Sequence, residues 1–311
     1  FRAIALLRIV PPKIFGPWDR SQVVPLCSAG IHSLSIKYLY YAFPHTVYFF
    51  IARFLGIEEL GFYYLSYNWA HGFVTYILQF IGHVMFPAFA SIGSNRGKVL
   101  RGYQEYIARI ALLTTPFNAG LALIAPLLIP FALGDRWVSA IMPCQMLCLY
   151  AYFSAFYSAD FTVLQSLGFF KKVSWSMAIE IAVFLILIYP CARMGGLLGV
   201  TALMSVSKIF GSLLLLSHVK KALGQSWLAA LRIRAPSFLS TLARVAALLV
   251  LGYYLKGQGV SEPLQLFFCV VLGALIYAGL YLVIHRGSRE EMQRIVQDLM
   301  MLSVMKKAKN R

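Results

Sequence analysis

The chain alternates long apolar runs with short polar connections, which is the pattern of a protein that crosses a membrane several times. A helical crossing takes ~20 predominantly apolar residues. Runs of about that length cover residues 24–52, 62–90, 107–133, 138–167, 173–192, 197–217, 239–255 and 264–284. The pattern therefore predicts an all-α integral membrane protein with about eight transmembrane helices.

The second run, within residues 61–91, carries its polar residues in a regular order. They follow one another at steps of three or four positions, so at 100° per residue they fall on one stripe of a helix. The stripe consists of Asn68, His71, Thr75, Gln79 and His83. Lipid cannot satisfy these groups, so they must face protein or a water-filled cavity. Both contact between helices and the lining of a substrate pathway are compatible with this pattern.

Two lysines lie inside predicted spans, where an ionisable group costs at least ~2.5 kcal/mol and needs a partner or a cavity. Lys37 is near the middle of the first span, too deep to reach either surface easily, and we expect it to face a cavity. Lys208 shares a face of the sixth span with Thr201 and Ser205, which gives a second polar stripe. A lysine in such a place can hold a phosphate or another anionic group.

Two acidic residues also lie inside predicted spans. Glu180 is close to the start of the fifth span, at a depth similar to that of Lys208 on the next, antiparallel span. The sequence thus leaves Lys208 either a structural ion pair with Glu180, a contact with an anionic substrate, or a coupling role. Asp160, in the fourth span, is predicted to be a cation or proton site, or a partner for one of the lysines.

The composition and the placement of charge support a membrane location. The 311 residues are 60% hydrophobic and 13% charged, with a mean hydropathy of +0.73, whereas soluble domains carry about 25% charged residues. The net charge of +17 raises the question of a nucleic-acid partner. However, most Lys and Arg residues fall in alternate loops, and the opposite loops hold only Arg53, Arg136, Arg193 and Lys256. This positive-inside pattern predicts cytoplasmic termini and no nucleic-acid role.

Nothing in the sequence indicates catalysis, a metal or a cofactor. The outward loops are short, so we expect no extramembrane catalytic domain and no enzyme activity. The five cysteines lie in apolar runs, and no further ligand completes a metal set around Cys144 and Cys148. Cysteines in such runs are predicted to be small core residues.

The run from Arg53 to Trp137 resembles polysaccharide-transporter-family flippases, which belong to the superfamily of MATE exporters and lipid II flippases. RFLGIEELGFYYLSYN is similar to the short outward turn of that family, and FPAFASI with its basic loop is similar to the next cytoplasmic turn. PFNAGLALIAPLLIPFALGDRW resembles the span that follows. Two positions depart from the pattern, since Val47 stands where many relatives carry an acidic residue and Ala52 replaces a glycine.

The resemblance implies a transporter that moves undecaprenyl-diphosphate-linked oligosaccharide across the bacterial inner membrane by alternating access, for export of surface polysaccharide such as O-antigen. Lys208 and Lys37 would then hold the diphosphate, and the polar stripes would meet the sugar hydroxyls. Expected partners are the lipid-linked substrate, membrane lipids and other polysaccharide export proteins. The alternatives are a MATE-type drug or cation exporter, a lipid II flippase and, less favoured by the short outward loops, a polymerase or ligase of the same pathway.

The resemblance also implies a division of the chain. Residues 1–23 form a cytoplasmic or interfacial segment, 24–217 a six-helix second lobe, and 218–238 a cytoplasmic interfacial loop. Residues 239–284 supply a C-terminal pair of membrane helices, and 285–311 a basic amphipathic cytoplasmic tail. Because the chain does not begin with Met, we read Phe1 as an internal position and expect a missing N-terminal lobe.

Overall fold

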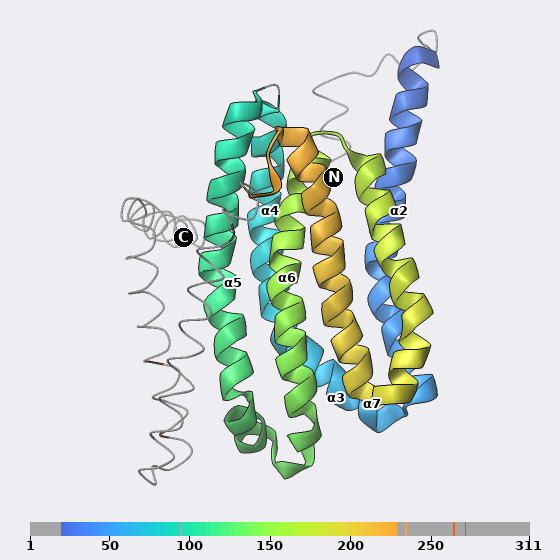
Figure 1. Cartoon of the computed structure of the whole chain (residues 1–311), viewed down its shortest axis with the longest axis vertical. Helices are drawn as coiled ribbons and strands as arrows, with labels where there is room; N and C mark the ends of the chain where they lie inside the picture. The colour runs from blue at the N-terminus through green and yellow to red at the C-terminus, as the bar shows by residue number, and fades with distance from the viewer. Residues whose placement is uncertain (1–19, 94, 229–233, 235–263, 265–270, 272–311) are drawn as a thin grey trace, which may run out of the picture.

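The computed structural model describes residues 20–93 and 95–228, together with Arg234, Leu264 and Val271. This part of the chain is a bundle of long helices that run side by side (Figure 1). The elements, in order, are α2 (Arg20–Phe54), α3 (Ile57–Tyr67), the π-helical turn η1 (Asn68–Gly72), α4 (Phe73–Ile92), α5 (Arg96–Leu133), the 3-10 turn η2 (Asp135–Ala140), α6 (Ile141–Ser166) and α7 (Phe170–Leu223).

The 54-residue α7 is two antiparallel helices joined at Gly196. Gly196 has φ 54° and ψ −137°, a conformation that only glycine adopts readily. Three residues later, Gly199 lies so close to the Cys191 carbonyl that a Cβ at this position would collide with it. These two glycines let the chain turn back on itself, as the separate predicted spans 173–192 and 197–217 require.

Four helical segments are long and apolar enough to cross a membrane in the part of the chain that the structure describes: Ile57–Ile92, Arg96–Leu133, Asp135–Ser166 and Phe170–Leu223. The prediction of an all-α membrane protein is confirmed. The predicted first span corresponds to α2, which is long enough but not among these four, because tyrosines, histidines and Lys37 lower its hydropathy.

Several predicted segments lie outside the described residues. These are most of the first segment, the spans 239–255 and 264–284 apart from two single positions, and the tail 285–311. The described part of segment 218–238 differs from the predicted loop, because α7 continues to Leu223 before Gly224 ends it.

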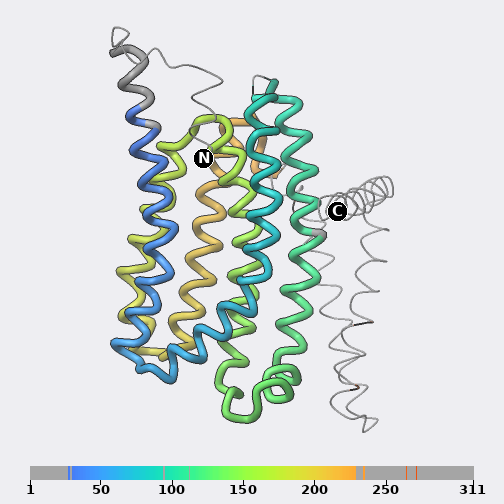
Figure 2. The backbone as a smooth tube through the Cα atoms, turned by 180° about the vertical axis from the view of Figure 1, so that it is seen from behind, coloured from blue at the N-terminus to red at the C-terminus, as the bar shows by residue number. Residues whose placement is uncertain are grey.

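α6 is the central helix of the bundle and is buried along most of its length. It packs against α3, α4, α5 and α7, whereas α2 packs against α7 and α3 (Figures 1 and 2). Large apolar side chains that remain exposed, such as Phe49 on α2 and Phe80 on α4, are suited to contact lipid. This arrangement leaves space between α2, α4 and α6.

The turns before α5 and α7, together with the end of α7, lie at one end of the bundle (Figure 1). We call this the basic end, because it carries Arg96, Lys98, Arg101, Lys171, Lys172, Lys220 and Lys221. The opposite end carries the α2–α3, α5–α6 and Gly196 turns, where both signs of charge occur. The antiparallel fold thus gathers at one end the loops that the positive-inside pattern assigned to one side.

Candidate functional site

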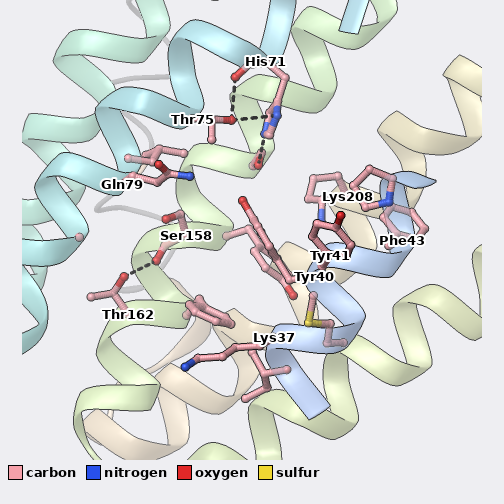
Figure 3. Close-up of a pocket in the computed structure, with 18 of the residues that line it drawn as sticks. Lys37, Tyr40, Tyr41, Phe43, His71, Thr75, Gln79, Ser158, Thr162 and Lys208 are labelled. Carbon is pink, nitrogen blue, oxygen red and sulfur yellow. Dashed lines mark hydrogen bonds between the residues drawn. The ribbon is translucent and has the colours of Figure 1, made fainter. Parts of the chain in front are cut away.

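A cavity of about 950 Å³ lies between α2, the α3–η1–α4 rod and α6, with Met177 and Lys208 of α7 also lining it. This volume is at the upper end of the range for small-ligand sites. Figure 3 shows the side chains from these elements converging on one space. Aromatic residues make up much of the wall, with Tyr40, Tyr41, Phe43, Tyr67, Tyr76, Phe86, Tyr150, Tyr157 and Phe161 all in contact with it.

The whole polar stripe predicted on the second run lines this cavity: Asn68, His71, Thr75, Gln79 and His83. The helix that carries it is not regular, however, because residues 68–72 form a π-helical turn. Such turns are rare inside helices and occur frequently at functional sites. The turn shifts the register of the stripe at its deep end, where Asn68 donates to the carbonyl of Tyr64 (2.7 Å).

His71 is held in one orientation by bonds to both ring nitrogens. The Thr75 hydroxyl lies 3.0 Å from Nδ1, and the Ser154 hydroxyl of α6 lies 3.0 Å from Nε2. The Thr75 hydroxyl donates its only hydrogen to the His71 carbonyl (2.8 Å). Its oxygen must therefore accept from Nδ1–H of the same histidine. Nε2 shares its hydrogen bond with Ser154. The imidazole of His71 is thus a fixed part of the cavity wall that joins η1 to α6.

Lys37 extends from α2 into the cavity, where its side chain is exposed (Figure 3). No ion pair joins it to any acidic residue among those that the structure describes. Its ammonium group is therefore a positive charge available to a ligand.

Lys208 also touches the cavity, but its charge is already paired. Its Nζ donates to Glu180 Oε1 at 2.7 Å, and both side chains are buried. The ammonium lies 4.1 Å from the centroid of the Tyr157 ring. Gly211 leaves room for the Glu180 carboxylate, since a Cβ there would collide with it. This ion pair is one of the alternatives that the sequence left open for Lys208, and it is present in the structure.

Thr201 and Ser205 do not line the cavity, which corrects the expectation that they belong to its polar wall. Ser205 donates to the backbone carbonyl of Met146 (2.7 Å), and the Thr201 hydroxyl lies 3.4 Å from the Met146 sulfur. Both residues therefore join α7 to α6, the usual role of small hydroxyl side chains between membrane helices.

Asp160 lies in a second buried ion pair, with Arg234 rather than with a lysine. The Arg234 guanidinium donates to both carboxylate oxygens, at 2.6 and 2.8 Å, and Tyr103 donates to one of them at 2.6 Å. Arg234 also reaches Ser212 (3.3 Å). Sequence reasoning assigned Arg234 to an interfacial loop and missed this contact. None of these four residues lines the cavity.

Three comparisons place the chain among known proteins. A family model described as polysaccharide biosynthesis protein matches residues 1–142. Lipopolysaccharide biosynthesis protein WzxC of Escherichia coli (strain K12) is 25% identical over 185 residues, which cover 57% of this chain and 36% of WzxC. The solved structure of lipid II flippase MurJ in an inward closed conformation superposes with a TM-score of 0.52 at 19% identity, over 73% of this chain and 45% of MurJ.

These matches confirm the resemblance to the polysaccharide-transporter family that the motifs between Arg53 and Trp137 indicated. The likeness to MurJ supports the same fold, an all-helical membrane protein. The chain matches less than half the length of either relative.

Proposed function

We propose that this chain forms part of a transporter that moves a diphosphate-linked oligosaccharide on a polyprenyl carrier across the bacterial inner membrane, for the export of surface polysaccharide. The observation that carries the proposal is the cavity itself. It combines the exposed cation Lys37, a stripe of hydrogen-bonding side chains and a largely aromatic wall between membrane helices. The family match over residues 1–142 supports this substrate class.

The chemistry of the cavity divides the substrate between two regions. Lys37 is the group that meets the diphosphate, because Lys208 is already neutralised by Glu180. Asn68, Gln79 and His83 are exposed to the cavity and can exchange hydrogen bonds with sugar hydroxyls. The tyrosines combine an apolar ring with a polar tip, which suits the alternating apolar and hydroxyl-bearing surfaces of a sugar.

The cavity extends towards the basic end of the bundle. It runs from the depth of His71 to Gln165, one residue before the end of α6. Because basic loops favour the cytoplasmic side, we infer that this end and both termini of the chain are cytoplasmic and that the cavity is accessible from the inner leaflet. Alternating access would require the rest of the transporter to close this side and open the other.

Deleting the gene that carries this sequence is expected to abolish one surface polysaccharide and to leave its lipid-linked precursor accumulating on the cytoplasmic face. The measurement is glycan immunoblotting together with mass spectrometry of extracted lipid-linked oligosaccharides, with the intact gene restored as control. Accumulation of peptidoglycan precursors instead would favour a lipid II flippase. Increased drug sensitivity with normal glycan would favour a drug exporter. The positive charge of Lys37 disfavours a cationic drug as the cargo.

The proposed orientation gives a second prediction. In a variant without native cysteines, a cysteine at Glu59 is expected to react with an impermeant maleimide added to intact spheroplasts, because Glu59 lies at the end opposite the basic end. A cysteine at the exposed Lys171 should react only after the membrane is permeabilised. The reverse labelling pattern would show that the basic end is outward and would overturn the inferred direction of access.

A further inference from the structure

Two segments that are far apart in the sequence meet at the basic end. One is the start of α7, with Lys171 and Lys172, and the other is its end, with Lys220 and Lys221. Figure 1 shows both ends of α7 at this end of the bundle. We call Lys171, Lys172, Lys220 and Lys221 the lysine cluster.

Aromatic rings position two of these ammonium groups without neutralising them. Lys172 Nζ lies 4.5 Å from the centroid of the Phe169 ring, and Lys220 Nζ lies 4.6 Å from that of Trp227. Contacts of this kind are favourable even at exposed sites and restrict the motion of a long side chain. The remaining members, Lys171 and Lys221, are exposed. The cluster is thus partly ordered before any ligand arrives.

No carboxylate balances this charge among the described residues nearby in the chain. From Ser166 to Leu228 the sequence contains one acidic residue, Glu180, and that one is paired with Lys208 inside the bundle. At the opposite end the arginines are accompanied by Glu58, Glu59 and Asp135. Four lysines that form no ion pair with any described carboxylate repel one another and favour an anionic partner.

The apolar groups beside the cluster indicate where that partner lies. Trp227 is 44% exposed and Leu228 is 81% exposed, immediately after the end of a membrane helix. Tryptophan concentrates at the level of the lipid headgroups, where its ring is partly apolar and its N–H is wet. Lysines at this level are attracted to anionic lipids.

We propose that the lysine cluster, with Trp227, is a binding site for the phosphate headgroups of anionic phospholipids in the surrounding leaflet. No member of the cluster lines the transport cavity, so the site is separate from the one described above. Such a lipid would join the two ends of α7, and with them both halves of that helix, at the membrane surface.

The test is the affinity of the purified full chain, in detergent, for short-chain phosphatidylglycerol and for phosphatidylcholine. Replacing Lys171, Lys172 and Lys221 with glutamine removes three exposed members of the cluster. The matched control replaces Arg96, Lys98 and Arg101, three exposed basic residues at the same end. Because all six side chains are exposed, an unchanged melting temperature without lipid verifies that each variant is folded.

We expect the cluster variant to bind phosphatidylglycerol at least about tenfold more weakly and the control variant to change less than about threefold. Added salt should weaken binding to the intact protein, since the attraction is electrostatic. Equal losses in the two triple variants, or no preference for phosphatidylglycerol over phosphatidylcholine, would overturn the proposal. So would competition by inorganic phosphate alone at similar affinity, or tighter binding of farnesyl diphosphate, which would make the cluster a site for the transported headgroup.

Discussion

Replacing Lys37 with glutamine is expected to abolish polysaccharide export while the protein still accumulates normally in the membrane. The Lys37 ammonium is exposed to the cavity and has no ion pair among the described residues, so its removal leaves no buried charge unpaired. Hydrogen bonds to charged groups contribute about 1.5–3 kcal/mol, which corresponds to a loss of roughly tenfold to a hundredfold in the affinity for a diphosphate. The measurement is surface glycan per amount of membrane-embedded protein.

Two further variants separate the charge of Lys37 from its position. Lys37→Arg keeps the positive charge and should retain part of the export activity, although its planar fork presents the charge differently. Lys98→Gln removes a charge that is exposed at the basic end and does not line the cavity, so it should leave export unchanged. Normal glycan in the Lys37→Gln strain would exclude Lys37 as the diphosphate ligand.

The sequence predicted the cavity wall on α4 because the physical constraint there is strong. Five polar groups at helical spacing in an apolar run have only protein or water as partners, and the structure places Asn68, Thr75 and the other members of the stripe in one cavity. The π-helical turn was not predictable from this spacing. Steps of three and four fit a regular helix, and the spacing does not show that residues 68–72 will form a wider turn in contact with α6.

On α7, Thr201 and Ser205 share a helix face with Lys208 but, contrary to the prediction, do not line the cavity with it. A polar stripe specifies that its members avoid lipid, not which neighbour satisfies them. Short hydroxyl side chains can be satisfied by a carbonyl one helix away, as Ser205 is by Met146, whereas the longer lysine reaches the cavity and Glu180 together. Periodicity therefore identified the face of α7 that avoids lipid. It could not show which residues on that face line the cavity and which contact α6.

The pair of Asp160 and Arg234 could not be predicted from position in the sequence. The two residues are 74 positions apart, and Arg234 belongs to a basic stretch that resembles an interfacial segment. Glu180 and Lys208 were easier to connect because depth along two consecutive antiparallel spans places them at the same level. Depth in the membrane can predict a contact only where both partners lie on helices whose direction is known.

The largest effect on stability is expected from breaking the Glu180–Lys208 pair on one side only. Lys208→Met leaves the Glu180 carboxylate buried without its cation, and removing one partner of a buried pair typically costs about 3–5 kcal/mol. We expect little of this variant in the membrane and a much lower melting temperature in detergent. Glu180→Gln should be less severe, because the Lys208 ammonium also contacts the Tyr157 ring and can turn towards the cavity.

The double variant Glu180→Gln/Lys208→Met removes both charges and is expected to recover most of the lost stability, since a buried pair replaced by neutral groups is often close to neutral overall. Losses that add up in the double variant would contradict an energetic coupling between the two residues. Glycan export measured in the double variant then distinguishes two roles for Lys208. A double variant that is stable and exports glycan makes the pair structural, whereas one that is stable and inactive means that Lys208 leaves Glu180 to meet the substrate during transport.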